Sequence, residues 1–250
     1  LICEVYHLMK DILGLGQDEI AKEFQDWNKG LLDSFLMEIT ADIMKFKDVD
    51  GEYLLPKIRD TAGQKGTGKW TGISALEYGV PVTLIGEAVF ARCLSALKDE
   101  RVIASKALPK SPVPSSVDKR AFLVHLQQAL YASKLISYTQ GFMLLREAAK
   151  VNNWNLNNGG IALMWRGGCI IRSVFLGNIK EAYTKNPQLT NLLLDPFFTE
   201  RISSSLPALR QVVSQAVLGG VPAPALSAAL AFYDGYRSEV LPANLLQAQR

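Results

Sequence analysis

Apolar side chains recur every three or four residues along most of this 250-residue chain. That spacing places them on one face of an α-helix, where they can pack against a core. By this pattern the sequence predicts helices at residues 1–13, 18–27, 31–46, 83–94, 118–145, 168–179, 187–194, 206–218 and 222–236. No segment shows the sustained alternation of apolar and polar residues that is typical of a half-buried strand. The predicted fold class is therefore all-α, a large multi-helix domain.

Polar residues and glycines mark where several of these helices should begin or end. Asp18, Thr83 and Asp118 precede apolar runs, and their side chains can accept hydrogen bonds from the free N–H groups of a helix N-terminus. The stretch that starts at Asp118 is the longest, and Gly141 within it predicts a bend. Gly14 follows the first helix as a stop signal.

The pattern predicts one helical domain, residues 1–250, made of two similar halves. We place the halves at about residues 1–108 and 118–250, joined at the surface by the Pro/Ser-rich stretch 109–116. Similar segments keep their order in both halves, and their offset rises from 136 (residues 6 and 142) through 138 (27 and 165) to 141 (79 and 220). An internal duplication with insertions would produce this series. Chance similarity between apolar helices is the alternative.

Composition narrows the class of protein without identifying it. Apolar residues make up 48% of the chain, enough for one large core or two small ones. Lys and Arg (27) exceed Asp and Glu (24) by only three, and no long block of one sign occurs, so a nucleic-acid partner is not indicated. No run approaches the roughly 20 apolar residues of a membrane-spanning helix. We expect a soluble protein with no membrane partner.

Cys3, Cys93 and Cys169 are far apart in the sequence and are flanked by apolar residues. An odd number with this spacing predicts reduced thiols in or near the core of an intracellular, cytoplasmic protein rather than a set of disulfides. The chain has no CxxC pair and no His/Cys cluster, so no metal site is predicted.

The segment from Ile58 to Trp70, IRDTAGQKGTGKW, differs from every helical stretch around it. Its glycines let the backbone turn tightly and expose N–H groups to a ligand. Lys65 and Lys69 add positive charge and Thr67 adds a hydroxyl, which suits an oxyanion such as phosphate, especially if the loop leads into a helix near Trp70. A flexible solvated turn is the alternative that composition alone leaves open.

Residues 63–69 also match the spacing GxxxxGK of a nucleotide-binding P-loop, which we exclude. That motif continues with Ser or Thr to hold magnesium, whereas the bulky Trp70 stands at this position. A P-loop also follows a buried strand, and the residues just before Gly63 are rich in charge instead.

Residues 58–70 resemble the hallmark motif of the 6-phosphogluconate dehydrogenases, and at thirteen residues the match is specific. The resemblance continues through LEYGVP at 76–81, EAVFAR at 87–92, GGIALMWRGGCIIRS at 159–173 and FYDGYR at 232–237, so it covers essentially the whole chain. It implies that the chain is the all-helical C-terminal domain of such a dehydrogenase, without the N-terminal nucleotide-binding domain.

Members of this family oxidise 6-phosphogluconate with a nicotinamide cofactor, usually NADP, and release carbon dioxide and ribulose 5-phosphate in the pentose phosphate pathway. They need no metal. The resemblance implies that Lys65, Thr67 and Arg92 bind the phosphate of the substrate. It further implies a homodimer in which Arg250 reaches into the site of the partner subunit.

The resemblance also implies what the chain lacks. The general-base lysine and the proton-donating glutamate of the family correspond to positions before residue 1, so no catalytic residue is expected within the chain. Both ends read as interrupted helices, and we expect a fragment that does not transfer hydride alone. The alternative is a truncated, non-catalytic homologue that serves as a dimerising or phosphosugar-binding module.

Overall fold

A computed structural model describes residues 1–110 and 117–250, which form twelve α-helices, two 3₁₀ helices and no β-strand. The predicted all-α class is confirmed for this part of the chain. The α-helices are α1 (Ile2–Asp11), α2 (Gln17–Trp27), α3 (Phe35–Lys45), α4 (Thr67–Tyr78), α5 (Thr83–Ala96), α6 (Lys98–Ala107), α7 (Lys119–Asn152), α8 (Asn158–Arg166), α9 (Leu176–Lys185), α10 (Pro196–Gly219), α11 (Pro224–Tyr236) and α12 (Ala243–Ala248). The 3₁₀ helices are η1 (Leu55–Lys57) and η2 (Leu192–Leu194). Most of the predicted surface connection, residues 109–116, lies outside the described residues.

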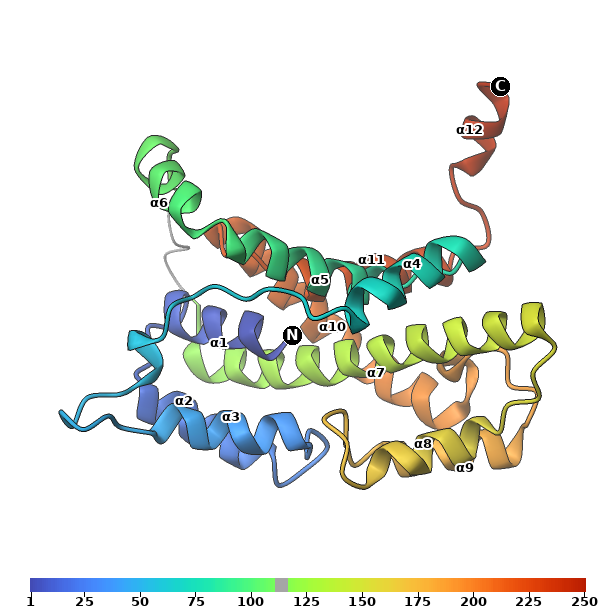
Figure 1. Cartoon of the computed structure of the whole chain (residues 1–250), viewed down its shortest axis with the longest axis horizontal. Coiled ribbons are helices and arrows are strands. Elements are labelled where there is room, and N and C mark those ends of the chain that lie inside the picture. The colour runs from blue at the N-terminus through green and yellow to red at the C-terminus, as the bar shows by residue number, and fades with distance from the viewer. Residues whose placement is uncertain (111–116) are drawn as a thin grey trace.

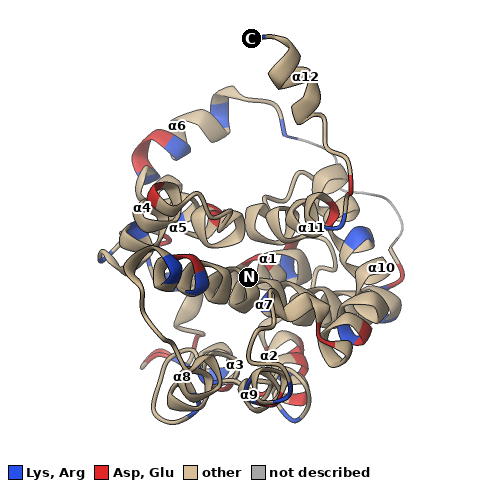
Figure 2. Ribbon diagram, turned by 90° about the vertical axis from the view of Figure 1, so that its right-hand side faces the viewer, with Lys and Arg blue, Asp and Glu red and all other residues tan. Residues whose placement is uncertain are grey.

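The helices form three layers around α7, which is 34 residues long (Figure 1). The middle layer holds α1, α7 and α10, with α4, α5 and α11 on one side and the hairpins α2–α3 and α8–α9 on the other. Figure 2 shows α6 and α12 projecting from the outer layer of α4, α5 and α11. Among the described helices, none combines the length and the apolar character that a membrane crossing requires.

The central helix α7 is enclosed on every side along its middle. Residues 129–133 are consecutive and at most 4% exposed, whereas a surface helix alternates buried and exposed positions. At its start, the Asp118 carboxylate accepts a hydrogen bond from the Ala121 N–H at 2.7 Å, as predicted for this cap. The helix then continues through Gly141 as one α-helix. Neighbours must therefore cover all its faces, and α1, α5, α10 and α11 pack against it.

Two polar contacts join parts of the chain that are far apart in sequence. The Glu4 carboxylate of α1 accepts hydrogen bonds from the N–H groups of Ala225 at 2.7 Å and Leu226 at 2.9 Å, at the start of α11. The Gln140 side chain of α7 accepts from the Leu84 N–H at 3.1 Å, at the start of α5. Each side chain satisfies N–H groups that a helix N-terminus leaves free, so α1 and α7 fix where α11 and α5 begin.

Two of the predicted helix caps are wrong. α2 begins one residue before Asp18, and the Gly16 N–H donates to the Glu19 carboxylate at 2.9 Å. α5 includes Thr83 as its first residue, and the Thr83 hydroxyl accepts from Gln140 Nε2 at 3.1 Å instead of capping the helix. In both cases a different side chain supplies the hydrogen bond at the helix start.

Three predicted helical ranges are much shorter in the structure, and 1–13 and 222–236 are each trimmed at one or both ends. Of residues 31–46, only residues 35–45 are helical, and the Ser34 hydroxyl caps the start of this helix, α3. Of residues 168–179, only those from Leu176 onward are helical, as the start of α9; Gly168 has φ +73°, and residues 169–175 form turns and the bridge at Ser173. Residues 187–194 contain only η2, which buries Leu192 and Leu193 and leaves Leu194 exposed. α6 and α8 lie outside the predicted ranges.

The three thiols lie further out than predicted. Cys3 and Cys93 are exposed and Cys169 is half-buried, and all three are free. Cys3 lies on the outer side of α1, whose inner side buries Val5 and Leu8. The apolar neighbours of Cys3 and Cys93 were misleading because adjacent residues of a helix face different directions, and Cys169 lies on irregular backbone between α8 and α9.

α4 and α10 end in the same way. Gly79 and Gly220 follow the last turn with φ values of +67° and +65°, the left-handed conformation that favours glycine. In each case the next residue, a valine, returns its N–H to an alanine carbonyl of the last turn, at 2.8 Å for Val80 and 2.9 Å for Val221. Each end then leads into the next helix, α5 or α11, and these two helices pack together.

The two hairpins meet at a short antiparallel bridge between Ser34 and Ser173. The backbones on either side of the bridge exchange hydrogen bonds of 3.2 and 3.0 Å. Beside them, Arg172 pairs with Glu38 at 2.6 Å. The bridge therefore connects the α2–α3 hairpin to the α8–α9 hairpin across the lower layer.

Near this bridge, the ammonium group of Lys134 lies 5.6 Å from the centre of the Phe175 ring. Burial lowers the pKa of Lys134 from 10.5 to about 8, and Asp33 opposes the shift. Below about pH 8 this lysine is charged in both states, and its buried charge destabilises the folded one. Stability rises between about pH 8 and 10.5, where the unfolded chain holds a proton that the folded chain has lost.

We predict that Lys134→Met stabilises the protein at neutral pH by on the order of 2 kcal/mol, because it removes a buried charge. The advantage should shrink as the pH rises from about 8 to 10.5. Urea unfolding of wild type and variant near pH 7 and near pH 10 measures both effects. Lys150→Met, at an exposed position of the same helix, is the matched control. Equal shifts in the two variants would contradict the prediction.

Candidate functional site

The glycine-lysine loop (residues 63–69) carries the chain into the N-terminus of α4. Gly66 is buried with φ +116°, and α4 starts at Thr67, close to the predicted start. The first hydrogen bond of the helix runs from the Trp70 N–H to the Gly66 carbonyl at 2.8 Å. The N–H groups of residues 67–69 therefore have no partner within the helix, and no side chain caps them. A helix start of this kind attracts anions.

The loop runs alongside α5 and contacts it at two points. A Cβ atom added to Gly68 would lie 2.6 Å from the Val89 side chain, so α4 approaches α5 as closely as a glycine allows. Further back, the Ala62 N–H donates to the Ser95 hydroxyl at 2.9 Å. Arg92 is three residues from each of these positions on α5 and so shares their face of the helix. The side of α5 that carries Arg92 therefore faces the loop.

Three cations of this region have no acidic partner in the described part of the chain. Lys65, Lys69 and Arg92 are exposed and take part in none of its ion pairs. Basic residues close by are neutralised; Arg59, for example, pairs with Asp99 at 3.3 Å. Unpaired positive charge beside free N–H groups is the arrangement that binds an oxyanion through charge-assisted hydrogen bonds.

The structure places three of the four predicted binding residues on adjacent elements. Lys65 lies in the loop, Thr67 is the first residue of α4, and Arg92 is exposed on the neighbouring α5. Arg250 follows α12, a helix without buried residues that stands clear of the other helices in Figure 1 and Figure 2. Within one chain, Arg250 therefore does not join the other three.

Sequence patterns assigned no role to three further residues of this region: Asp60, Ser95 and Arg101. Arg101 Nη2 donates to the backbone carbonyls of Asp60 at 3.0 Å and Ser95 at 2.9 Å. Hydrogen bonds from Lys98 and Arg101 lower the pKa of the Asp60 carboxyl to about 2. Asp60 belongs to the motif, but Arg101 lies 41 residues further on. The one sequence signal for these contacts is that Ser95 lies three residues after Arg92, on the same face of α5.

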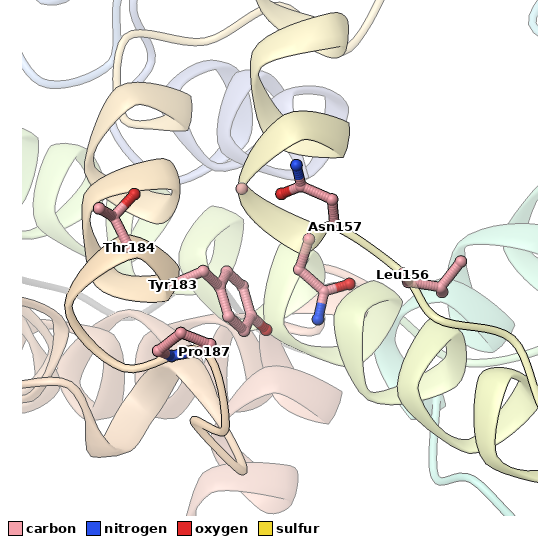
Figure 3. Close-up of a pocket in the computed structure, with 7 residues that line it drawn as sticks. Leu156, Asn157, Tyr183, Thr184 and Pro187 are labelled. Atoms are coloured by element: carbon pink, nitrogen blue, oxygen red, sulfur yellow. The ribbon is translucent and has the colours of Figure 1, made fainter.

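A separate pocket of about 270 Å³ lies at the N-terminus of α8, against α9. Figure 3 shows Tyr183 projecting from α9 toward the first turn of α8. Burial raises the pKa of Tyr183 to about 12, so its hydroxyl keeps its proton. None of the predicted binding residues lines this pocket. Across residues 1–110 and 117–250, no three His, Cys, Asp or Glu side chains gather closely enough to hold a metal ion.

Together, the fold and the loop define an all-helical domain that presents free N–H groups and unpaired cations at the start of one helix. The chain belongs to the 6-phosphogluconate dehydrogenase family, because the family described as "6-phosphogluconate dehydrogenase, C-terminal domain" matches residues 1–250. The family resemblance of residues 58–70 is thereby confirmed over the whole chain.

Individual relatives agree with this family. The chain is 70% identical over 251 residues to "6-phosphogluconate dehydrogenase, decarboxylating" of Ceratitis capitata and 67% identical over 252 residues to that of Ovis aries. Both matches cover 100% of this chain and 52% of the relative. A solved structure of Plasmodium falciparum 6-phosphogluconate dehydrogenase is 44% identical to this chain, with a TM-score of 0.97. The match covers 100% of this chain and 54% of the P. falciparum chain. That relative is described in its apo form, in complex with its cofactor NADP+ and in complex with its substrate 6-phosphogluconate. The chain thus spans about half the length of the relatives that it matches.

We predict that Gly68→Ala lowers the free energy of unfolding by about 1–3 kcal/mol, because the new methyl group would overlap Val89 and push α4 away from α5. Gly72→Ala in the same helix is the matched control, since its Cβ would meet no atom within 4 Å. The control should be neutral or stabilising by up to about 1 kcal/mol, the difference in helix propensity. Urea unfolding measures both, and equal effects of the two substitutions would contradict the close approach of the helices.

Proposed function

We propose that this chain is the substrate-binding and dimerisation part of an NADP-dependent oxidoreductase that oxidatively decarboxylates 6-phosphogluconate to ribulose 5-phosphate in the pentose phosphate pathway. The observation that carries the proposal is the glycine-lysine loop. Its helix start leaves the N–H groups of residues 67–69 free, next to cations that have no acidic partner in the described chain. Membership of the 6-phosphogluconate dehydrogenase family supports the choice of substrate.

Lys65, Thr67 and Arg92 offer the substrate phosphate three different contacts. The ammonium group of Lys65 is a mobile point charge, and the guanidinium of Arg92 is a planar fork that can bind two oxygens at once. Thr67 adds a hydroxyl and its free backbone N–H. Because every group is a hydrogen-bond donor toward the ligand and two are charged, the site favours a phosphate dianion over an uncharged hydroxyl end of a sugar.

We assign no catalytic residue to these 250 residues and place NADP binding mainly outside them. The described residues contain no strand leading into a glycine-rich turn and so do not fit a dinucleotide. The P. falciparum relative is described with NADP+, and this chain covers 54% of it. We therefore propose that the activity belongs to a longer, cytoplasmic, metal-independent parent. A truncated homologue that only dimerises or binds a phosphosugar is the alternative, and a nucleotide-binding domain in the parent would decide against it.

We further propose a homodimer formed through the layer that contains α4 and α5. Large exposed apolar side chains on these helices are Trp70, Ile73, Leu76, Phe90 and Leu94. Monomers rarely expose large apolar patches, so these side chains on two packed helices favour an interface. α12 rises on the same side of the molecule, with Arg250 at its end (Figure 1). A second copy packed on this layer would bring its own Arg250 toward the glycine-lysine loop.

We also propose that the two halves of the domain derive from an internal duplication. Ser34 and Ser173, which form the antiparallel bridge, are 139 residues apart, within the range of offsets between similar sequence segments. An antiparallel contact between equivalent residues is what a local two-fold axis requires. Gly79 and Gly220 are 141 residues apart and end their helices with the same left-handed geometry, which supports the same relation.

Calorimetric titration of the chain with 6-phosphogluconate tests the phosphate site. We expect binding that Lys65→Ala weakens about 10- to 100-fold, because one charge-assisted hydrogen bond is lost. Lys45→Ala, at an exposed position of α3, is the control and should bind like wild type. Full binding by Lys65→Ala, or no binding by the wild type, would contradict the proposal that this chain holds the phosphate.

Sedimentation equilibrium over a range of concentrations tests the homodimer. We expect Leu76→Glu and Phe90→Glu to weaken self-association at least about tenfold, because each would bury a charge in the proposed interface. Both side chains are exposed in the single chain, so the fold should tolerate the change. Val49→Glu, at a fully exposed position before η1, should associate like wild type. A wild-type chain that stays monomeric at every concentration would refute the proposal.

A further inference from the structure

The glycine-lysine loop depends on α5 and α6 for its shape. From Ile58 to Gly66 the chain forms no helix, so the polar groups of its backbone need partners elsewhere. Two residues outside the motif supply them: Ser95, near the end of α5, and Arg101, on α6.

The Ser95 hydroxyl connects the loop to the turn of α5 that carries Arg92. Its oxygen lies 2.7 Å from the Arg92 carbonyl, 2.9 Å from the Ala62 nitrogen and 3.3 Å from the Ala62 carbonyl. A hydroxyl has one proton, so it donates to the nearer Arg92 carbonyl and accepts from the Ala62 N–H. The Ser95 hydroxyl thereby connects the backbone of Ala62, three residues before Lys65, to the backbone of Arg92.

Arg101 makes a second connection at the same place. Its Nη2 atom donates to the Ser95 carbonyl at 2.9 Å and to the Asp60 carbonyl at 3.0 Å. The same guanidinium pairs with the Asp60 carboxylate at 3.3 Å, and Lys98 pairs with the other carboxylate oxygen at 2.6 Å. We call Ser95, Lys98 and Arg101 the loop clamp. It holds the backbone of Asp60 and Ala62 through contacts from two helices.

The loop clamp is not part of the hydrophobic core. Asp60, Ser95 and Arg101 line an open cavity of about 480 Å³ beside α5 and the start of α11. Ser95 is half-buried there rather than enclosed. Removing its hydroxyl therefore leaves the packing between the layers intact and takes away only the connection between loop and helix.

We propose that Ser95 is a positioning residue for the phosphate site, which together with Arg101 keeps Lys65 opposite Arg92. The inference rests on the proposed function, because it names what holds the two phosphate-binding cations in register. A loop without this connection samples many backbone conformations, and a ligand would have to order it on binding. A loop that is already ordered binds the ligand without losing this conformational entropy.

Three variants test the role of the hydroxyl. Ser95→Ala removes it and Ser95→Thr retains it. Ser105→Ala is the matched control, because among the described residues the Ser105 hydroxyl on α6 bonds only to the Val102 carbonyl of its own helix, at 2.9 Å. Two independent readouts are amide hydrogen exchange across residues 60–66 and calorimetric titration with 6-phosphogluconate.

We expect Ser95→Ala to speed exchange in the loop about three- to tenfold and to weaken binding by a similar factor, as the loss of one neutral hydrogen bond predicts. Its thermal midpoint should match that of Ser105→Ala, whose loop exchange and affinity stay at wild-type values. Ser95→Thr should restore both readouts, because threonine can make the same bonds.

Unchanged loop exchange in Ser95→Ala would overturn the inference, and so would a change that Ser105→Ala shares, since that would report a general loss of helix stability. Unchanged affinity in Ser95→Ala, with a wild type that binds, would also overturn it. If the wild type binds no 6-phosphogluconate, the proposed function fails, while the exchange rates still decide whether Ser95 orders the loop.

Discussion

The enclosure of the middle of α7 on all its faces is the constraint from which the other helices take their positions. Each large apolar side chain buried there stabilises the fold by roughly 1.5–3 kcal/mol, but only while neighbouring helices exclude water from every direction. The same helix supplies Gln140, which bonds the N–H of Leu84 at the start of α5. The packing of α7 therefore sets where α5 begins, and through α5 it sets where Arg92 lies relative to the glycine-lysine loop.

Under the proposed duplication, the two halves differ in how the helices α4 and α10 begin. At the offset of 141 that relates Gly79 to Gly220, Gly66 corresponds to Pro207. In the first half the chain breaks at this point, and α4 begins with free N–H groups. In the second half α10 continues through Pro207 and begins earlier, where Asp195 caps it. A carboxylate at a helix N-terminus repels an anionic ligand, so of these two helix starts only that of α4 is suited to an anion.

The features that the sequence could predict are those that depend on neighbouring residues. The all-α class follows from apolar periodicity, the start of α7 from Asp118, and the character of the loop from its glycines and lysines. The contacts of Glu4 with α11 and of Ser95 with Ala62 could not be predicted, because a single sequence does not say which distant groups meet. The range 168–179 was wrong because its apolar residues are not on one buried helix face: Ile170 and Val174 are exposed, and the backbone before Leu176 is irregular.

Unpaired cations on two adjacent elements raise the free energy of the ligand-free protein, because like charges repel. Exposure to water keeps that cost small at Lys65 and Arg92, and the neutralised residues around them, such as Arg59, add no further repulsion. Exposure would also leave the side of the proposed phosphate that faces away from α4 and α5 in contact with solvent. Any further protein donor to that side would come from another surface. Arg250, after a helix without buried residues, is suited to supply it to the proposed second chain.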